Sequence, residues 1–384
     1  VHVKTGETKP LYHTKNQTQY GPGAGAATFS PEAGRVLFLR GIRNADKDRP
    51  YDLTRRTGIA IDISYPGQEI FLDARNIVPP FTSGALRGGT HAHSWSGDGK
   101  WISCTYNDYV LQQLSKTDSS IKDLRTVAVM APLSQVKVPE YGSENNDGEM
   151  FSVVVAKVTA FPRPGSDDVD RAFDETWIGT KGYEKKSGAW QQRAIAFQGN
   201  VKDVNGKTKT EIFVVDIPDD ITKPAPGEVL EGTPRTMPSP PAGTSQRRIT
   251  YSKQGVHGPR HWLRSTSDGK LIAFLARDDK GIVQIFCASP NGGETKQLTF
   301  NDFPVQSTFN FSPDDMLIAY IADNSIFINE LKTNKATRIT KKFSDAEAPV
   351  NGVVWSHDGK SLAYNRYIPH NGKMFLQIFL LTEK

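Results

Sequence analysis

The chain has 384 residues, a formal net charge of +5 and 37% hydrophobic residues, so it is long enough for a large core. The mild charge and the lack of Lys/Arg runs exclude the electrostatic pattern of a nucleic-acid binder, and no stretch approaches the roughly 18 apolar residues of a membrane helix. Its 33 Gly and 24 Pro are typical of a protein rich in turns, and its two cysteines exclude a disulfide framework.

Residues 1–11 predict an outer β-hairpin, and five copies of a strand–turn–strand motif follow along the chain. Each copy joins two apolar strands through a turn with Ser or Thr, an acidic residue and, in most copies, Gly, because Asp bonds its own backbone and Gly accepts a positive φ. The copies occupy residues 28–39, 94–105, 264–275, 310–321 and 354–365, with acidic positions Glu32, Asp98, Asp268, Asp314 and Asp358. The last three lie 46 and 44 residues apart, which is the period of a four-stranded propeller blade, roughly 40–50 residues.

The remaining strands are predicted from apolar runs between turn signals. Between Asp98 and Asp268 we expect two further blades, with insertions at about 162–188 and 218–243, the second rich in Pro. The strands expected there are 125–130, 151–157, 193–197 and 211–216. Later strands are expected at 281–289, 295–299, 325–331, 335–340 and 376–381.

These elements predict an all-β fold, a single β-propeller domain over 1–384 with about seven four-stranded blades around a central channel. Because an open sheet edge is a liability, we expect the two termini to close the ring by completing one blade. The alternative that further strands precede Val1 stays open. A start without Met fits either a removed signal peptide or a trimmed sequence. We expect a periplasmic or secreted protein and, separately, a monomer. The cysteines, expected to be buried and reduced, fit the cytoplasm equally, so that alternative stays open.

The repeated Phe/Trp-Ser-Pro-Asp-Gly motif resembles the TolB-like propeller repeat. The stretches 86–93 (Leu-Arg-Gly-Gly-Thr-His-Ala-His) and 259–262 (Pro-Arg-His-Trp) resemble an uncharacterised family of bacterial TolB-like propeller proteins. That family is distantly similar to oligogalacturonate lyases and, in architecture, to propeller-type ulvan lyases. The resemblance implies a propeller fold and suggests a uronate lyase, an activity for which oligogalacturonate lyases use manganese held by His and Gln.

Histidines break the repeat just before its turn. Seven residues before each acidic position, two copies carry His91 and His261 where the others carry small or amide residues, and His93 replaces an apolar residue two positions after His91. Because side chains two positions apart share a side of a strand, we expect His91 and His93 on the same side. Together with His261 and Gln306, they are predicted to approach one another near the mouth of the channel. Such a set could hold a divalent metal such as Mn, Zn or Ca, with no organic cofactor, or supply a general base.

These residue types suit β-elimination from an anionic oligo- or polysaccharide that contains uronate. A cation neutralises the carboxylate, a base removes the adjacent proton, and an acid protonates the leaving oxygen. The residues assigned to catalysis are His91, His93, Arg87, Arg260 and Tyr109; those assigned to substrate binding are Arg87, Arg260, Tyr106 and His257; those assigned to a metal are His91, His93, His261 and Gln306. The alternative is a non-catalytic TolB-like periplasmic scaffold or ligand-binding propeller.

Overall fold

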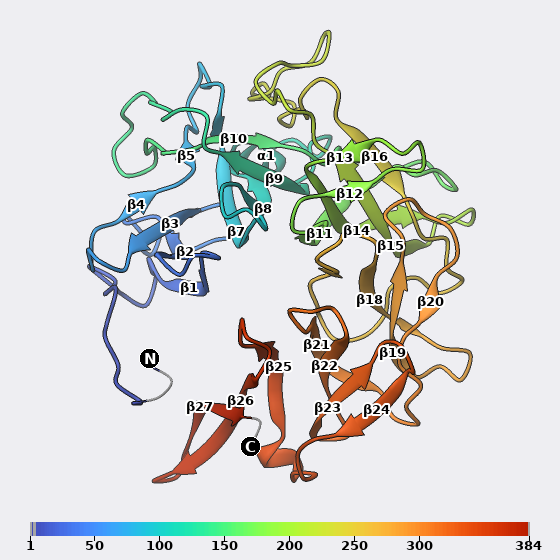
Figure 1. Cartoon of the computed structure of the whole chain (residues 1–384). Coiled ribbons are helices and arrows are strands. Elements are labelled where there is room, and N and C mark those ends of the chain that lie inside the picture. Colours follow the sequence, from blue (N-terminus) through green and yellow to red (C-terminus); the bar gives the residue numbers. More distant parts are fainter. Residues whose placement is uncertain (1, 3–4, 383–384) are drawn as a thin grey trace. The chain divides into compact units, whose positions relative to one another are not determined.

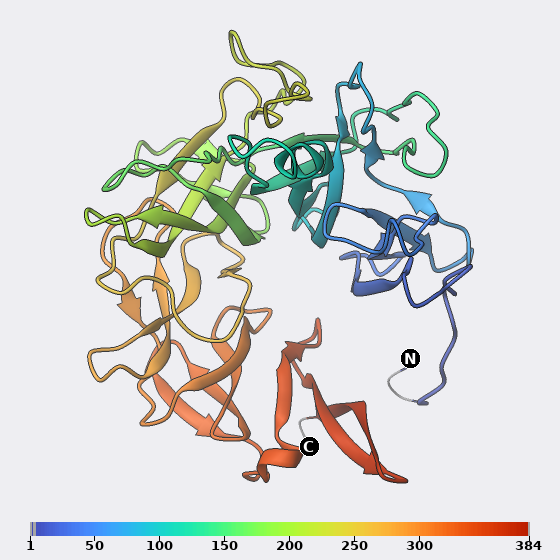
Figure 2. The same cartoon turned by 180° about the vertical axis from the view of Figure 1, so that it is seen from behind.

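A computed structural model describes residue 2 and residues 5–382, which divide into two compact units (Figures 1 and 2). Unit 1 holds the described residues up to Arg163, together with Asp168–Glu175 and Val215–Gln246. Unit 2 holds Pro164–Asp167, Thr176–Val214 and the described residues from Arg247 onward. Each unit is described by itself.

Unit 1 contains two four-stranded antiparallel meanders. The first is β1 (Ala24–Phe29), β2 (Arg35–Gly41), β3 (Arg56–Asp62) and β4 (Ile70–Phe71). The second is β7 (Gly88–Trp95), β8 (Ile102–Asp108), β9 (Arg125–Ala131) and β10 (Phe151–Val154). A short parallel pair, β5 (Ala74–Arg75) and β6 (Ala85–Leu86), accompanies them, and helix α1 (Tyr109–Ser115) follows β8 directly, with Asp108 as its N-cap.

Unit 2 contains two four-stranded meanders and a three-stranded one. They are β17 (Arg264–Ser265), β18 (Ile272–Arg277), β19 (Val283–Ala288) and β20 (Lys296–Gln297); β21 (Val305–Phe311), β22 (Leu317–Ala322), β23 (Ser325–Glu330) and β24 (Lys335–Arg338); and β25 (Pro349–Trp355), β26 (Ser361–His370) and β27 (Lys373–Thr382). Unit 2 also holds β12 (Tyr183–Glu184), β13 (Trp190–Gln191), β14 (Ala194–Lys202), most of β15 (Thr208–Asp216) and a 3-10 turn at Asp345–Glu347. Strand β11 (Arg171–Trp177) lies mainly in unit 1, and β16 (Ser245–Arg248) has residues of both units.

Local hydrogen bonds explain why the repeated motif turns where it does. In the four copies with Asp, a Ser or Thr hydroxyl donates to the Asp carboxylate and accepts a backbone N–H five residues further on. Ser312 Oγ lies 2.5 Å from Asp314 Oδ1 and 2.9 Å from Leu317 N. The residue after Asp takes a positive φ, as at Gly99 with 67°, which favours glycine there. The predicted turn chemistry is therefore confirmed.

A second feature repeats three times: a threonine lies two residues beyond the end of β16, β20 and β24. Its hydroxyl accepts a backbone N–H from an inner strand: Thr250 from Ile212 at 2.9 Å, Thr299 from Ile285 at 2.9 Å, and Thr340 from Ile326 at 3.0 Å. Thr299 and Thr340 lie just beyond β20 and β24, so the hydroxyls continue the ladder where the backbone pairing has ended.

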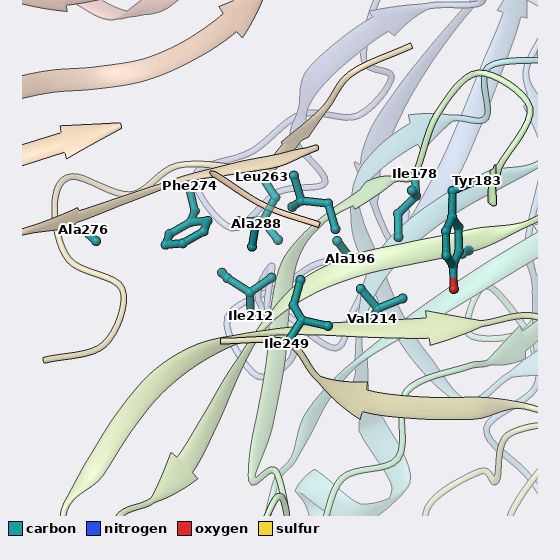
Figure 3. Close-up of a cluster of buried hydrophobic side chains, with 12 residues drawn as sticks. Ile178, Tyr183, Ala196, Ile212, Val214, Ile249, Leu263, Phe274, Ala276 and Ala288 are labelled. Carbon is teal, nitrogen blue, oxygen red and sulfur yellow. The ribbon is translucent and has the colours of Figure 1, made fainter. Parts of the chain in front are cut away.

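Apolar clusters lie between successive sheets. In unit 2, one cluster joins strands β14, β15, β18 and β19 through side chains such as Ile212, Val214 and Phe274 (Figure 3). On β18, Phe274 belongs to this cluster, whereas Ala273 and Leu275 belong to the cluster shared with β21–β23. Because side chains alternate along a strand, the β17–β20 sheet contributes one face to each of these two clusters.

The sheets described are propeller blades, so the fold is a mostly-β propeller. The strands expected at 125–130, 211–216 and 325–331 are confirmed with small shifts, whereas the strand expected at 151–157 ends at Val154. The expected hairpin at 1–11 falls partly outside the described residues, and its described residues form no strand. A count of seven blades and closure by the termini stay predictions.

The segments expected as insertions differ in structure. Residues 162–188 include β11 and β12, whereas the Pro-rich residues 218–243 form a loop with isolated bridges, Pro224 to Pro241 and Thr233 to Thr236. Both cysteines are buried free thiols, as expected. In the described part of the chain, no helix has the length and apolar character needed to cross a membrane.

Candidate functional site

The histidines of the second motif lie on β7, and a β-bulge separates them. His91 is opposite Thr105 and Ser94 is opposite Ser103, so two residues of β7 face one residue of β8 between these pairs. Ala92, within the bulge, has a φ of 56°. The expectation that His91 and His93 share one side assumed a regular strand, and the bulge removes that basis. Both side chains are buried, at 6% and 4% exposure.

His93 ends a buried hydrogen-bonded chain, the Asp73–Thr90–His93 chain. Asp73 Oδ1 accepts from Thr57 Oγ1 at 2.9 Å and from the N–H of Gly58 at 2.7 Å, and Oδ2 accepts from Thr90 Oγ1 at 3.0 Å. His93 Nε2 lies 3.0 Å from the same Thr90 oxygen. Since the Thr90 hydroxyl donates to Asp73, the imidazole must donate to Thr90 through Nε2–H.

Burial controls the protonation of this chain. Burial, with a smaller contribution from the charge of Arg56, lowers the pKa of His93 to about 3, while burial raises the pKa of Asp73. The imidazole is therefore neutral at physiological pH. Gly58 makes room for it, because a Cβ at that position would lie 2.9 Å from His93 Nε2. Nothing in the repeated motif points to Asp73 or Thr57, which come from other segments.

Arg87 is fully buried, and its guanidinium donates hydrogen bonds to other residues of unit 1. Its Nε and Nη2 donate to Asp108 Oδ2 at 2.9 and 2.6 Å, and Tyr106 donates to the same oxygen at 2.9 Å. Nη2 also donates to the carbonyl of Thr236 at 2.9 Å, and Nη1 to the carbonyl of Thr233. The Arg87–Asp108 pair thus anchors the Pro-rich loop, and burial raises the pKa of Tyr106 well above its ordinary value.

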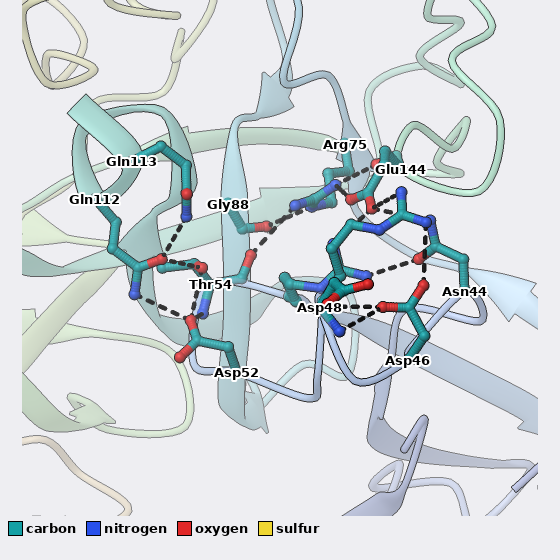
Figure 4. Close-up of polar contacts among 12 residues, drawn as sticks. Asn44, Asp46, Asp48, Asp52, Thr54, Arg75, Gly88, Gln112, Gln113 and Glu144 are labelled. Atoms are coloured by element: carbon teal, nitrogen blue, oxygen red, sulfur yellow. Dashed lines mark hydrogen bonds and ion pairs between the residues drawn. The ribbon is translucent and has the colours of Figure 1, made fainter. Parts of the chain in front are cut away.

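A second buried arginine network lies beside α1 (Figure 4). Arg75 donates to Glu144 Oε2 at 3.2 Å, to the carbonyl of Gly88 at 3.2 Å and to the carbonyl of Thr54 at 3.3 Å. The central carbon of its guanidinium lies 5.3 Å from the ring centroid of Tyr109. Burial lowers the pKa of Arg75. Arg75 therefore joins the start of β7 to the segments that carry Thr54 and Glu144.

His261, in unit 2, uses both ring nitrogens in hydrogen bonds. Its Nε2 accepts the N–H of Leu275 at 3.0 Å, and its Nδ1 lies 2.9 Å from the carbonyl of Pro259, to which it donates. Ser307, at the equivalent repeat position, accepts the N–H of Ile321 at 3.0 Å. The imidazole therefore replaces a hydroxyl that supports the strand pairing, and a metal ion on His261 would displace one of these bonds.

The other predicted residues of unit 2 lie nearer the surface. Arg260 is exposed, with its guanidinium 4.7 Å from the ring centroid of Trp262. Gln306 is exposed and accepts the N–H of Asn324 at 3.0 Å. His257 is half-buried. Among the described residues, no group of three or more His, Cys, Asp or Glu side chains is arranged to hold a metal ion.

A pocket of about 520 Å³ lies in unit 1 between the two meanders. Apolar side chains of Leu72, Trp95, Pro132 and Met150 line part of it. The remaining lining comes from the turns and strand ends, and it includes five charged residues: Glu32, Arg35, Asp62, Lys100 and Glu149. The volume is in the range of small-molecule sites, roughly 300–1,000 Å³. None of the residues assigned to catalysis from the sequence lines this pocket.

Residues 23–145 match the family model described as "Protein of unknown function (DUF3748)", and this stretch includes the Asp73–Thr90–His93 chain and most of the pocket. Among solved structures, puromycin hydrolase is similar with a TM-score of 0.50 and 12% identity, covering 94% of this chain and 44% of that one. A TolB-like structure from Agrobacterium tumefaciens (TM-score 0.41, 14% identity, 76% of each chain) and oligogalacturonate lyase in complex with manganese (0.48, 11%, 92% and 75%) are also similar. At these identities the likeness shows the fold alone.

A curated relative gives a stronger match. The "Uncharacterized protein YidR" of Escherichia coli (strain K12) is 36% identical over 371 residues, which cover 95% of this chain and 84% of that protein. The chain therefore belongs to the family of the uncharacterized protein YidR.

Proposed function

We propose that the protein is a non-catalytic, ligand-binding β-propeller that takes a small ligand in the pocket of unit 1. One observation carries the proposal: the pocket is lined by an indole, apolar side chains and charged groups suited to binding, and it is separate from the residues assigned to catalysis. Ligand sites commonly combine an apolar lining with a few placed polar groups. The proposal keeps the expectation of a monomeric, ring-closed propeller of about seven blades in the periplasm.

The state of Arg87 supports this proposal over a uronate lyase. A lyase needs a cation that reaches the substrate carboxylate. The Arg87 side chain has no exposed surface, and it donates to Asp108 and to two loop carbonyls. To bind a uronate, this side chain would have to leave a buried partner carboxylate, which is costly.

The test is an assay for turnover and binding on the same protein. The full chain is incubated with pectate and ulvan, with and without Mn²⁺, Zn²⁺ or Ca²⁺, while the ultraviolet absorbance of unsaturated products is followed. We expect no product above that of the heat-denatured protein. A metal-dependent rate that His93→Gln abolishes while the protein stays folded would refute the proposal.

A uronate lyase is the second candidate, and the Asp73–Thr90–His93 chain favours it. The chain fixes Nε2 as the protonated ring nitrogen, which leaves Nδ1 as the ring atom that would take up the substrate proton. For this candidate, Thr90→Val would lower the rate on uronate polymers by breaking the link to Asp73. Thr333→Val, at an exposed threonine of unit 2, serves as the matched control and would leave the rate unchanged.

A further inference from the structure

The pocket of unit 1 carries a donor that the fold leaves unsatisfied. The indole Nε1–H of Trp95 is buried, and no described residue accepts a hydrogen bond from it. A buried donor without a partner costs roughly 1–3 kcal/mol, so such groups are rare in native proteins. Trp95 also lines the pocket.

The fifth copy of the motif shows an acceptor for an indole N–H at this position. Trp355 occupies the same position of the fifth motif, and its Nε1 donates to the main-chain carbonyl of Asn310 at 3.3 Å. Asn310 is the residue before the corresponding aromatic residue in the preceding motif. In the fifth motif the indole therefore bonds a main-chain carbonyl, whereas Trp95 Nε1 has no acceptor among the described residues.

The charges around the pocket have both signs. Glu32 replaces the Asp of the other motifs, and in the described structure its carboxylate makes no hydrogen bond or ion pair; the Lys100 ammonium makes none either. Arg35 and Glu149 pair at 3.7 Å with side chains 41% and 48% exposed. Surface pairs of this kind are weak, so both members are available to a ligand with charges of both signs.

We propose that this pocket binds a short peptide with free termini. A peptide carbonyl accepts from Trp95 Nε1, an apolar side chain contacts Leu72 and Met150, and the termini pair with the carboxylate of Glu32 and the ammonium of Lys100. Because Nε1 is buried, the pocket side chains adjust as the peptide enters. This inference rests on the proposed binding function and names its ligand class.

The experiment titrates the full chain, labelled with ¹⁵N, with the tripeptide Ala-Leu-Ala. Each of the six tryptophans gives one indole N–H signal, and Trp95→Phe identifies the signal of Trp95. We expect that signal to shift saturably towards the position of a hydrogen-bonded N–H. Trp95→Phe should raise the Kd by roughly three- to tenfold, the loss of one hydrogen bond, while the matched variant Trp355→Phe leaves it unchanged.

One blocked peptide and two protein variants test the predicted contacts of the peptide termini. Acetyl-Ala-Leu-Ala-amide, which lacks both terminal charges, should bind at least about tenfold more weakly, and Glu32→Gln and Lys100→Met should each weaken the free tripeptide. If Trp95→Phe does not fold, these two surface variants still test the site. The proposal is overturned if Ala-Leu-Ala causes no saturable shift, or if the blocked peptide binds equally well. Turnover of pectate would instead refute the non-catalytic function and leave the peptide result standing.

Discussion

Replacing Arg87 by Met tests whether this arginine stabilises the fold through its ion pair with Asp108. Arg87 and Asp108 both have side chains with no exposed surface, joined at 2.6 Å. Removal of one partner from a buried pair leaves an uncompensated charge and costs about 3–5 kcal/mol. We expect Arg87→Met to lower the free energy of the first unfolding transition by that amount in urea, followed by circular dichroism and tryptophan fluorescence.

Two comparisons sharpen this experiment. The double variant Arg87→Met, Asp108→Asn removes both charges while the amide oxygen still caps α1, so it should recover about half of the loss. Arg163→Met breaks an exposed pair, with Arg163 79% exposed, and should cost about 0–1 kcal/mol.

The Pro-rich loop gives an independent signal of the same change. Arg87 holds the carbonyls of Thr233 and Thr236, so its loss should speed trypsin cleavage at Arg235, between them. If Arg87→Met lowers the free energy of unfolding by less than about 1 kcal/mol and leaves the cleavage rate unchanged, the structural role is refuted. Arg87 would then again be a candidate for substrate binding.

Further predictions concern pH, packing and the turn. The pKa of His93 is about 3 in the fold and ordinarily 6.5, so between these pH values the unfolded chain binds a proton that the native chain does not. The free energy of unfolding therefore decreases as the pH is lowered, by about 2 kcal/mol at pH 5. Urea titrations at pH 7 and pH 5 should show that His93→Leu loses this part of the pH dependence, and an unchanged pH dependence would contradict the reasoning. Gly58→Ala should cost about 1–3 kcal/mol, because its Cβ meets His93 Nε2; a thermal midpoint equal to that of the wild type would show that the imidazole moves freely. Ser312→Ala should cost about 1 kcal/mol, since the hydroxyl bonds Asp314 and Leu317; denaturation with no loss would mean that the turn closes without it.

The repeated turns and most strands could be predicted because their causes are local. Ser312 and Asp314 bond groups within five residues, so the sequence pattern contains the whole interaction. The bulge at Ala92 could not be predicted, because alanine carries no preference for the positive φ that it adopts there.

The surroundings of the candidate residues depend on contacts that are distant in the chain. His93 was singled out as an exception to the repeat, but Asp73, which fixes its tautomer through Thr90, lies outside the motif. Arg87 stood out as a possible substrate ligand, yet Asp108 and a loop about 150 residues further on enclose it. Sequence spacing identifies such residues, whereas burial decides what they are free to bind.

The β17–β20 and β21–β24 sheets each contribute to two apolar clusters, and this affects how cooperatively unit 2 unfolds. On β18, Phe274 and Leu275 belong to different clusters, one reaching β14 and β15 and the other reaching β21–β23. Each blade of unit 2 is therefore coupled mainly to its sequence neighbours, as in a one-dimensional array of interacting elements. Hydrogen exchange should then show a gradient of protection, with β25–β27, whose last strand has mostly exposed residues, opening before the better buried strands β18 and β22.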